Sequence, residues 1–155
     1  SDQVVDDIIS EALRHIDRRS TEHHITMNCG EIPLLVRVDA GLIMQVLINL
    51  VNNAIKYTPA GSTIQITAIQ RGNVAEICVS DNGAGIPNEL KERVFEMFFT
   101  GSNPTSDSRR SLGLGLSLCQ AIVHAHHGKM TLKDNLPHGC IFSFTVALSE
   151  VNLNE

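Results

Sequence analysis

The chain has 155 residues, of which 43% are hydrophobic and 19% are charged. This length is typical of one domain, and the composition excludes a collagen-like, coiled-coil or largely disordered chain. Twelve Lys and Arg residues against seventeen Asp and Glu residues give a net charge of −5. An acidic balance argues against broad binding to nucleic acid or to anionic membranes. We therefore expect a single domain over residues 1–155, in which any phosphate-binding site is local.

Nothing in the sequence predicts a membrane span or an export signal. The apolar stretch Leu42–Val51 is interrupted by polar residues and is much shorter than the roughly 20 residues that cross a bilayer. The first seven residues are acidic and lack the basic start of a secretory signal. The cysteines lack the paired spacing of zinc sites, so reduced thiols in a soluble, cytoplasmic domain are expected.

The first half of the chain predicts two helices and two strands. Val4–Ile16 has apolar residues at helical spacing along one stripe. His24–Cys29 and Leu34–Val38 have the composition of strands. Asp39 is a typical N-cap residue, and a helix is expected from there to about Tyr57.

A hairpin is expected next, with strands Thr63–Gln70 and Val74–Ser80 joined by a glycine turn. Pro87–Phe99 has the pattern of a short helix that ends in aromatic residues. Thr100–Ser111 contains no large apolar residue, which is typical of a mobile, functional loop.

The last part of the chain predicts a helix over Leu112–His127 and strands over Lys129–Lys133 and Cys140–Leu148. Helices interleaved with hairpin-connected strands favour an α+β fold. We expect a two-layer sandwich with helices on one face of a mixed, mainly antiparallel sheet.

Polar residues interrupt the second predicted helix on one side. Asn49, Asn53 and Lys56 are four and three residues apart, so their side chains project from nearly the same face. Carboxamide oxygens can bind magnesium directly or through water, and a lysine can contact a phosphate. The pattern suggests a site for a metal–nucleotide complex, and the alternative is a solvated helix face.

The segment Asp81–Pro87 follows the second hairpin strand. Asp-Asn-Gly is typical of a simple turn, but no partner strand follows it. A second glycine and Ile86-Pro87 suit a backbone that approaches a flat ligand and leaves Asp81 at the floor of a pocket. A carboxylate there needs donors, and an adenine amino group is one candidate.

Two glycines, Gly113 and Gly115, open the last predicted helix. Glycine lets a ligand approach the backbone, and the N–H groups at a helix start attract phosphate. The alternative is close packing of the helix.

The histidines are weaker indications of a site. His124 and His127 have no carboxylate nearby for a metal site, and His23 and His24 are expected at a solvated strand edge.

Four segments, taken in order, resemble the four conserved boxes of histidine kinase catalytic domains; they are Asn49–Tyr57, Asp81–Pro87, Val94–Phe99 and Gly113–Leu116. The resemblance covers most of the chain. Val46–Pro59 and Leu116–His126 also resemble potassium-responsive sensor kinases. The family is grouped with the gyrase, MutL and heat-shock chaperone ATPases, so the resemblance implies their left-handed nucleotide-binding sandwich.

The resemblance implies ATP and magnesium as cofactors. Asn53 would bind magnesium with Asn49 beside it, and Lys56 would reach the phosphates, which makes Asn49 and Lys56 the catalytic candidates. The other residues that it assigns to nucleotide binding are Tyr57, Asp81, Gly83, Gly85, Ile86, Phe95, Phe98, Arg109, Arg110, Gly113, Leu114, Gly115 and Leu116.

Individual roles follow from the same resemblance. Tyr57 would lie along the adenine, and Asp81 would accept a hydrogen bond from its amino group. Phe95 and Phe98 would anchor one end of a lid over residues 100–111, and the Gly113–Leu116 box would close it over the triphosphate.

Three positions depart from the pattern. Thr100 stands where many relatives have an arginine, so Arg109 or Arg110 is expected to contact the terminal phosphate instead. Ser111 precedes Leu112 where the last box usually has its leading glycine, and His127 replaces the first glycine of a common His-Gly-Gly. The first departure concerns the phosphate contacts, and the other two concern lid movement and activity.

None of the seven histidines is followed by an acidic residue, as the phosphoacceptor histidine of the family is. The expected function is therefore to bind Mg-ATP and to phosphorylate a histidine on a separate dimerisation domain of a membrane-anchored parent kinase, which acts on a response regulator. The fragment itself is expected to be monomeric. One alternative is a nucleotide-binding regulator without kinase activity. Another is a clamp-type ATPase, but that class usually has a catalytic glutamate where this chain has Asn49.

Overall fold

The structure is a computed structural model that describes residues 2–16, 22–91, 93–95 and 107–149, with only the helical backbone described for 107–114. Its elements in chain order are β1 (Asp2–Val4), α1 (Val5–Arg14), β2 (His24–Asn28), β3 (Leu35–Arg37), α2 (Ala40–Tyr57), β4 (Thr63–Arg71), β5 (Val74–Asp81), α3 (Asn88–Lys91), the 3-10 turn η2 (Arg93–Phe95), α4 (Asp107–Ala125), β6 (Met130–Asp134) and β7 (Cys140–Ala147).

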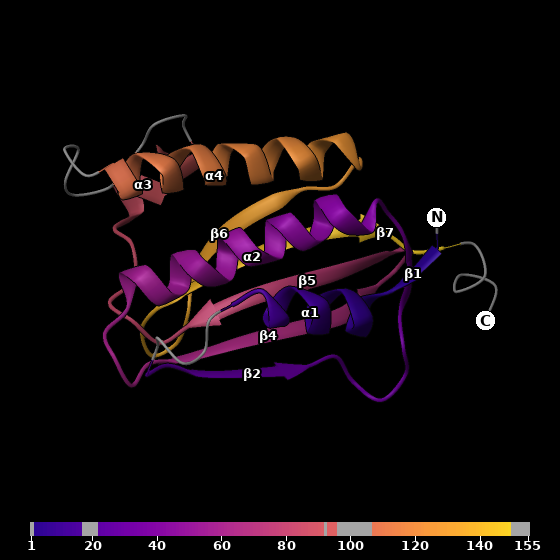
Figure 1. The fold of residues 1–155 in the computed structure, drawn as a ribbon, viewed down its shortest axis with the longest axis horizontal. Coiled ribbons are helices and arrows are strands. Elements are labelled where there is room, and N and C mark those ends of the chain that lie inside the picture. The colour runs from indigo at the N-terminus through magenta and orange to yellow at the C-terminus, as the bar shows by residue number, and fades with distance from the viewer. Residues whose placement is uncertain (1, 17–21, 92, 96–106, 150–155) are drawn as a thin grey trace.

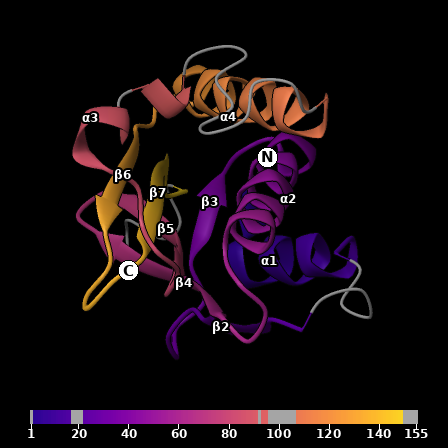
Figure 2. The same ribbon diagram turned by 90° about the vertical axis from the view of Figure 1, so that its left-hand side faces the viewer.

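Five strands form one sheet in the order β2-β4-β5-β7-β6. β2 and β4 are parallel, and the other neighbours are antiparallel. β1 and β3 form a separate antiparallel ribbon. Helices α1, α2 and α4 cover one face of the sheet (Figures 1 and 2). The predicted two-layer α+β architecture with a mixed, mainly antiparallel sheet is confirmed.

The core lies between the sheet and these helices. Along β5, buried side chains alternate with half-buried ones, so Ala75, Ile77 and Val79 face the helices. Asp81, the last residue of β5, continues this alternation and is also buried. The strand register therefore turns a carboxylate toward the inner face of the sheet.

Helix α2 begins and ends where its sequence predicts. The Asp39 carboxylate accepts a hydrogen bond from the Leu42 backbone N–H at 3.1 Å, which confirms the predicted N-cap. At the other end Thr58 has an extended backbone, as expected for a residue that precedes proline. The last turn of the helix, which contains Lys56 and Tyr57, therefore lies at one end of the molecule.

The structure differs from the prediction at three elements. The ribbon strand β1 was not predicted. The single helix over Pro87–Phe99 is wrong within the described residues, where α3 and η2 are separate turns. In η2, Val94 is buried and Phe95 packs its ring against Phe142 at a centroid distance of 6.0 Å.

Helix α4 begins at Asp107 and not at Leu112, so the prediction of a loop up to Ser111 is wrong for residues 107–111. Asp107 suits the first turn of a helix, and a glycine inside a helix costs only about 1 kcal/mol. The helix can therefore run through Gly113 and Gly115. Residues 100–106 of the predicted lid lie outside the described residues. No helix in the described part of the chain is long and apolar enough to cross a membrane.

Candidate functional site

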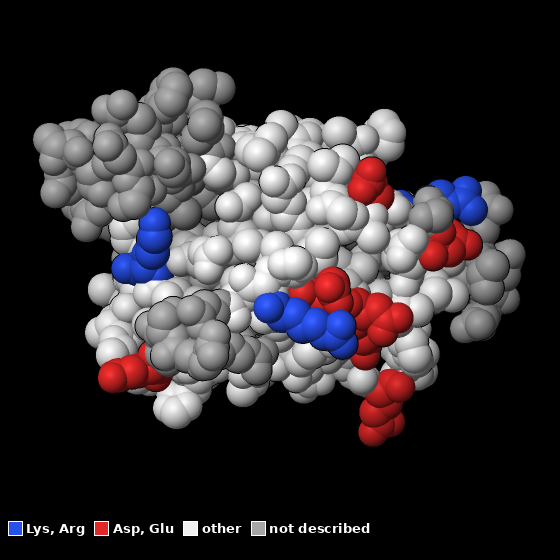
Figure 3. Space-filling view, in the orientation of Figure 1, with Lys and Arg blue, Asp and Glu red and all other residues white. Residues whose placement is uncertain are grey.

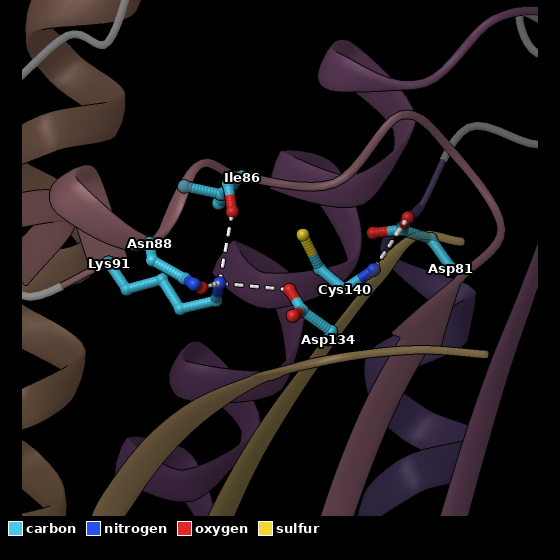
Figure 4. A network of polar contacts seen from close by, with 6 residues as sticks. All are labelled: Asp81, Ile86, Asn88, Lys91, Asp134 and Cys140. Carbon is cyan, nitrogen blue, oxygen red and sulfur yellow. Dashed lines mark hydrogen bonds and ion pairs between the residues drawn. The ribbon is translucent and has the colours of Figure 1, made fainter. Parts of the chain in front are cut away.

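The functional candidates gather at one end of the molecule, where α2 and β5 end and α4 begins (Figure 1). At this end Asp81 is 8% exposed. Its Oδ1 accepts a hydrogen bond from the backbone N–H of Gly83 at 2.9 Å. It also accepts one from the backbone N–H of Cys140 at 3.3 Å (Figure 4). Within the described residues no donor reaches the other carboxylate oxygen, Oδ2. Asp81 is thus a fixed acceptor with one oxygen available for a ligand donor.

The loop after Asp81 is held by the loop between β6 and β7. Asn135 Nδ2 donates to the Asp81 carbonyl oxygen at 2.8 Å, and His138 Nδ1 lies 2.9 Å from the Gly83 carbonyl oxygen, to which it donates. Gly85 has φ +85° and approaches the Gly139 carbonyl. These contacts give the loop a defined shape without using the Oδ2 atom of Asp81.

Lys91 ties down the far end of the same loop. Its Nζ donates to the Ile86 carbonyl oxygen at 3.1 Å and to Asn88 Oδ1, and it pairs with Asp134 Oδ1 at 2.9 Å (Figure 4). The Lys91 side chain is only 16% exposed. The loop around Ile86 is therefore attached to β6 as well as to α3.

The end of α2 touches this loop directly. A Cβ atom on Gly83 would lie 2.5 Å from Thr58 Cγ2, so only glycine permits this approach. Thr58 Oγ1 donates to the Ala54 carbonyl oxygen at 2.6 Å, and His23 Nε2 lies 2.8 Å from Thr58 Oγ1. The prediction that His23 is a solvated edge residue is wrong, because it is half-buried in this contact, whereas His24 is exposed as predicted.

The polar residues of α2 are brought to the same end. Asn49 is half-buried, Asn53 is 7% exposed and Lys56 is exposed. Within the described residues the Asn53 carboxamide makes no hydrogen bond, and its polar atoms are not among the side-chain atoms that are fully buried without a partner. Tyr57 remains 42% exposed. A carboxamide to which no described residue is hydrogen-bonded, next to an exposed lysine, is an arrangement that suits a charged ligand.

Part of the predicted nucleotide-binding segment Gly113–Leu116 has a structural role. A Cβ atom on Gly115 would lie 3.3 Å from Asn49 Oδ1, so this glycine allows α2 and α4 to pack closely. Leu116 is 5% exposed and belongs to the core. The prediction that Gly113 and Gly115 open the helix is wrong, because both lie in its interior, whereas their contact with a phosphate stays a prediction.

Five predicted site residues cannot be assigned contacts. Arg109 and Arg110 are helical and not part of an extended lid, and of Gly113 and Leu114 only the helical backbone is described. Phe98 lies outside the described residues. Phe95, in contrast, is partly buried against the core. Five supporting residues were not predicted because they belong to no recognisable motif: His23, Thr58, Lys91, Asn135 and His138.

The thiols near the site are neutral at physiological pH. Burial raises the pKa of Cys140 to about 11, and the carboxylates of Asp81 and Asp134 add to this effect. Burial raises the pKa of Cys119 to about 12, against a smaller opposing effect of a hydrogen bond with Asn49.

On the face of the molecule in Figure 3, among the residues that are coloured, acidic and basic side chains lie in small, mixed groups, without a broad field of one sign. Any phosphate on this face would therefore be recognised by local groups.

Comparison with known proteins agrees with this geometry. Residues 38–150 match the family described as histidine kinase-, DNA gyrase B- and HSP90-like ATPases. The chain is 37% identical over 144 residues to the sensor protein KdpD of Clostridium acetobutylicum, which covers 93% of this chain and 16% of that protein. It is 38% identical over 139 residues to the adaptive-response sensory kinase SasA of Synechococcus elongatus, which covers 89% of this chain and 35% of that protein. The chain thus spans about a third or less of these relatives.

The fold also matches solved structures. The catalytic domain of histidine kinase ThkA has 32% sequence identity and a TM-score of 0.81, with 95% of this chain and 94% of that chain covered. ThkA has also been solved in complex with the response regulator protein TrrA. The arrangement of residues around Asp81, the family match and these similarities lead to one conclusion. The chain belongs to the histidine kinase-, DNA gyrase B- and HSP90-like ATPase family, as an ATP-binding catalytic domain of the sensor histidine kinase type.

Proposed function

We propose that this domain binds Mg-ATP and donates the γ-phosphoryl group to a histidine on a separate dimerisation domain of the same sensor kinase. The observation that carries the proposal is the buried Asp81 carboxylate. Its Oδ1 is held by two backbone N–H groups, while no described residue donates to Oδ2. An adenine amino group supplies the N–H donor that this acceptor lacks.

The surroundings of Asp81 suit a flat, uncharged ring. Gly83 and Gly85 keep side chains away from the loop, and Ile86 contributes an apolar wall whose carbonyl is held by Lys91. The Cys140 thiol is neutral, because burial raises its pKa to about 11. We assign the adenine to this pocket, with the ring of Tyr57 lying along it.

The residues of α2 fit the rest of Mg-ATP. Among the described residues, no three His, Cys, Asp or Glu side chains are close enough together to hold a metal ion. A buried carboxamide such as Asn53, with Asn49 one turn earlier, is a suitable oxygen ligand for magnesium that keeps most of its other ligands from water and phosphate. When bound, magnesium would neutralise the charge that develops on the phosphate oxygens.

The remaining groups position and stabilise the phosphates. Lys56 is exposed beside Asn53 and would place a positive charge near the transferred group. Arg109 or Arg110 would add positive charge from the first turns of α4, and Phe95 and Phe98 would anchor the segment before it. Positioning and electrostatics of this kind supply most of the catalysis in phosphoryl transfer.

The reaction would be an in-line displacement. A nitrogen of the acceptor imidazole forms a bond to the γ-phosphorus while the bond to the β–γ bridging oxygen breaks, and ADP leaves. The other ring nitrogen gives up its proton to a base on the dimerisation domain. Asn49 is neutral and cannot activate water as a carboxylate would, which disfavours simple hydrolysis.

The parent protein and its partners are also part of the proposal. We infer a dimeric, membrane-anchored kinase whose catalytic domain lies in the cytoplasm and is itself monomeric. The complex of ThkA with TrrA supports a response regulator as the next phosphate acceptor. A regulator that binds nucleotide without transferring phosphate is the second candidate, since Gly113 and Gly115 lie inside α4 and not at a phosphate-binding helix start.

Calorimetric titration with a non-hydrolysable ATP analogue, with and without magnesium, tests the pocket. Asp81→Asn keeps an oxygen for the N–H groups of Gly83 and Cys140 but places an amide donor against the adenine amino group. We expect micromolar-range binding by the wild type and at least tenfold weaker binding by Asp81→Asn, because a mispaired buried group costs about 1 to 3 kcal/mol. Asp7→Asn, on the exposed side of α1, is the matched control and should bind normally.

Two results would contradict the proposal: no binding by the wild type, or equal binding by Asp81→Asn. If binding is found, phosphotransfer to an added dimerisation domain is the next assay. A normal rate after Asn53→Ala would exclude the magnesium role, and nucleotide binding without any transfer would favour the regulator.

A further inference from the structure

His23 connects the start of β2 to the end of α2. The parallel register of β2 with β4 pairs His24 with Thr63, and the His24 N–H donates to the Ser62 carbonyl oxygen at 3.0 Å. His23 therefore lies beside the turn between α2 and β4. There its Nε2 is 2.8 Å from Thr58 Oγ1 and 3.2 Å from the Thr58 carbonyl oxygen.

The direction of these hydrogen bonds follows from Thr58. Its hydroxyl proton is used in the 2.6 Å bond to the Ala54 carbonyl oxygen, and a carbonyl oxygen carries no proton. Both Thr58 oxygens must therefore accept, and His23 Nε2–H is the shared donor. The imidazolium form and the neutral form with the proton on Nε2 both provide this donor.

The contact fixes the Thr58 side chain against the ligand-binding loop. With Oγ1 held by His23 and Ala54, the Cγ2 methyl is directed at Gly83, where an added Cβ would be only 2.5 Å away. The Gly83 N–H is one of the two donors that hold Asp81 Oδ1. On its other side the Gly83 carbonyl accepts from His138 Nδ1. The Gly83 peptide is thus held between Thr58 and the β6–β7 loop.

We propose that His23 is a positioning residue of the nucleotide pocket. It acts through Thr58, which keeps the Gly83 peptide where its N–H orients the Asp81 carboxylate. His23 itself contacts no ligand. The inference rests on the proposed nucleotide site at Asp81 and adds a residue to it that lies 58 positions earlier in the chain.

Three variants separate the donor from the bulk of the side chain. His23→Ala removes the donor, and His23→Gln places an amide N–H at a similar reach. His24→Ala changes the exposed neighbour on the same segment and is the matched control. Two readouts are compared: hydrogen exchange of the Gly83 amide without ligand, followed by NMR, and calorimetric affinity for a magnesium-bound ATP analogue.

In His23→Ala we expect faster exchange at Gly83 and roughly fivefold weaker nucleotide binding, the effect of about one hydrogen bond. His23→Gln should recover most of both values, and His24→Ala should match the wild type. Wild-type exchange and affinity in His23→Ala would overturn the proposal. A defect that His23→Gln does not recover would also overturn it, because the donor would then not be the cause.

The exchange measurement keeps this inference separate from the proposed function. If the wild type binds no nucleotide, the proposed function fails, while exchange at Gly83 still shows whether His23 positions the loop. If His23→Ala does not fold, Thr58→Ser replaces it. That variant keeps both hydroxyl bonds and removes only the methyl group directed at Gly83. Faster Gly83 exchange in Thr58→Ser supports the inference, and wild-type exchange overturns it.

Discussion

Replacing His127 by glycine is expected to stabilise the protein. His127 follows the C-terminus of α4 with φ +62°, in the left-handed region. Its N–H donates to the His124 carbonyl oxygen at 2.9 Å, and the Gly128 N–H donates to the Val123 carbonyl oxygen at 2.9 Å. This pair of bonds defines a Schellman motif, in which glycine is the usual residue at the position of His127. The departure from the family pattern at His127 is therefore a strained helix end.

The magnitude follows from the backbone. A side chain in the left-handed region costs about 1 to 2 kcal/mol, and the greater freedom of glycine in the unfolded chain offsets about half of the gain. We expect His127→Gly to raise the free energy of unfolding by about 0.5 to 1 kcal/mol. For a protein of this size that corresponds to a melting temperature higher by roughly 1 to 4 °C.

The assay is urea denaturation followed by circular dichroism, with thermal melting as a second measurement. His124→Gly is the matched control, because His124 is exposed and helical in the last turn of the same helix. There glycine should lower the free energy of unfolding by about 0.5 kcal/mol. A lower stability of His127→Gly, or shifts of the same sign in both variants, would refute the strain argument.

Three more perturbations give distinct expectations. Gly128→Ala should cost about 3 kcal/mol or more in urea denaturation, because its Cβ would lie 1.9 Å from the Thr145 carbonyl oxygen; an unchanged midpoint would contradict this. Burial raises the Cys119 pKa from 9.0 to about 12, so the folded state holds this proton more tightly, and the resulting stability is present below pH 9 and lost as the pH rises toward 12. The free energy of unfolding of Cys119→Ala should be lower than that of the wild type, and this difference should shrink above pH 9 by up to about 1.4 kcal/mol per pH unit. A difference that does not change with pH would argue against the raised pKa. A double-mutant cycle of Lys91→Met and Asp134→Asn should give a coupling below about 1 kcal/mol, because the Asp134 side chain is 60% exposed. Lys91→Met alone should lower the free energy of unfolding by more than this coupling energy, because the Ile86 carbonyl loses its donor. A coupling energy above about 2 kcal/mol would show instead that the ion pair is the main contribution of Lys91.

Local patterns predicted the fold class and several parts of the site. The hairpin pattern predicted a strand over Val74–Ser80, and the register of that strand carries Asp81 to the inner side of the sheet. The N-cap at Asp39 and the proline after Thr58 set the ends of α2, which present Asn53 and Lys56. Short-range chemistry was sufficient in these cases, because the caps, the turn and the periodicity all lie within a few residues of each other.

Contacts between distant segments could not be predicted. The bond from His23 to Thr58 depends on the parallel pairing of β2 with β4, and two consecutive histidines give no sign of it. The same holds for Asn135 and His138, which reach the loop after Asp81 from a hairpin more than fifty residues later. The start of α4 was misplaced for another reason. Gly113 and Gly115 were interpreted as a helix start, whereas Gly115 serves the close approach of α2 and α4.

The central position of β5 has a consequence for how the protein forms. β5 lies between β4, its hairpin partner, and β7, which follows about sixty residues later. The hairpin with β4 can form early from local contacts, but the N–H of Cys140 reaches Asp81 only when the last strand docks. Contacts of such high contact order form slowly. During synthesis on the ribosome, ligand affinity should therefore appear abruptly, once the final hairpin has emerged.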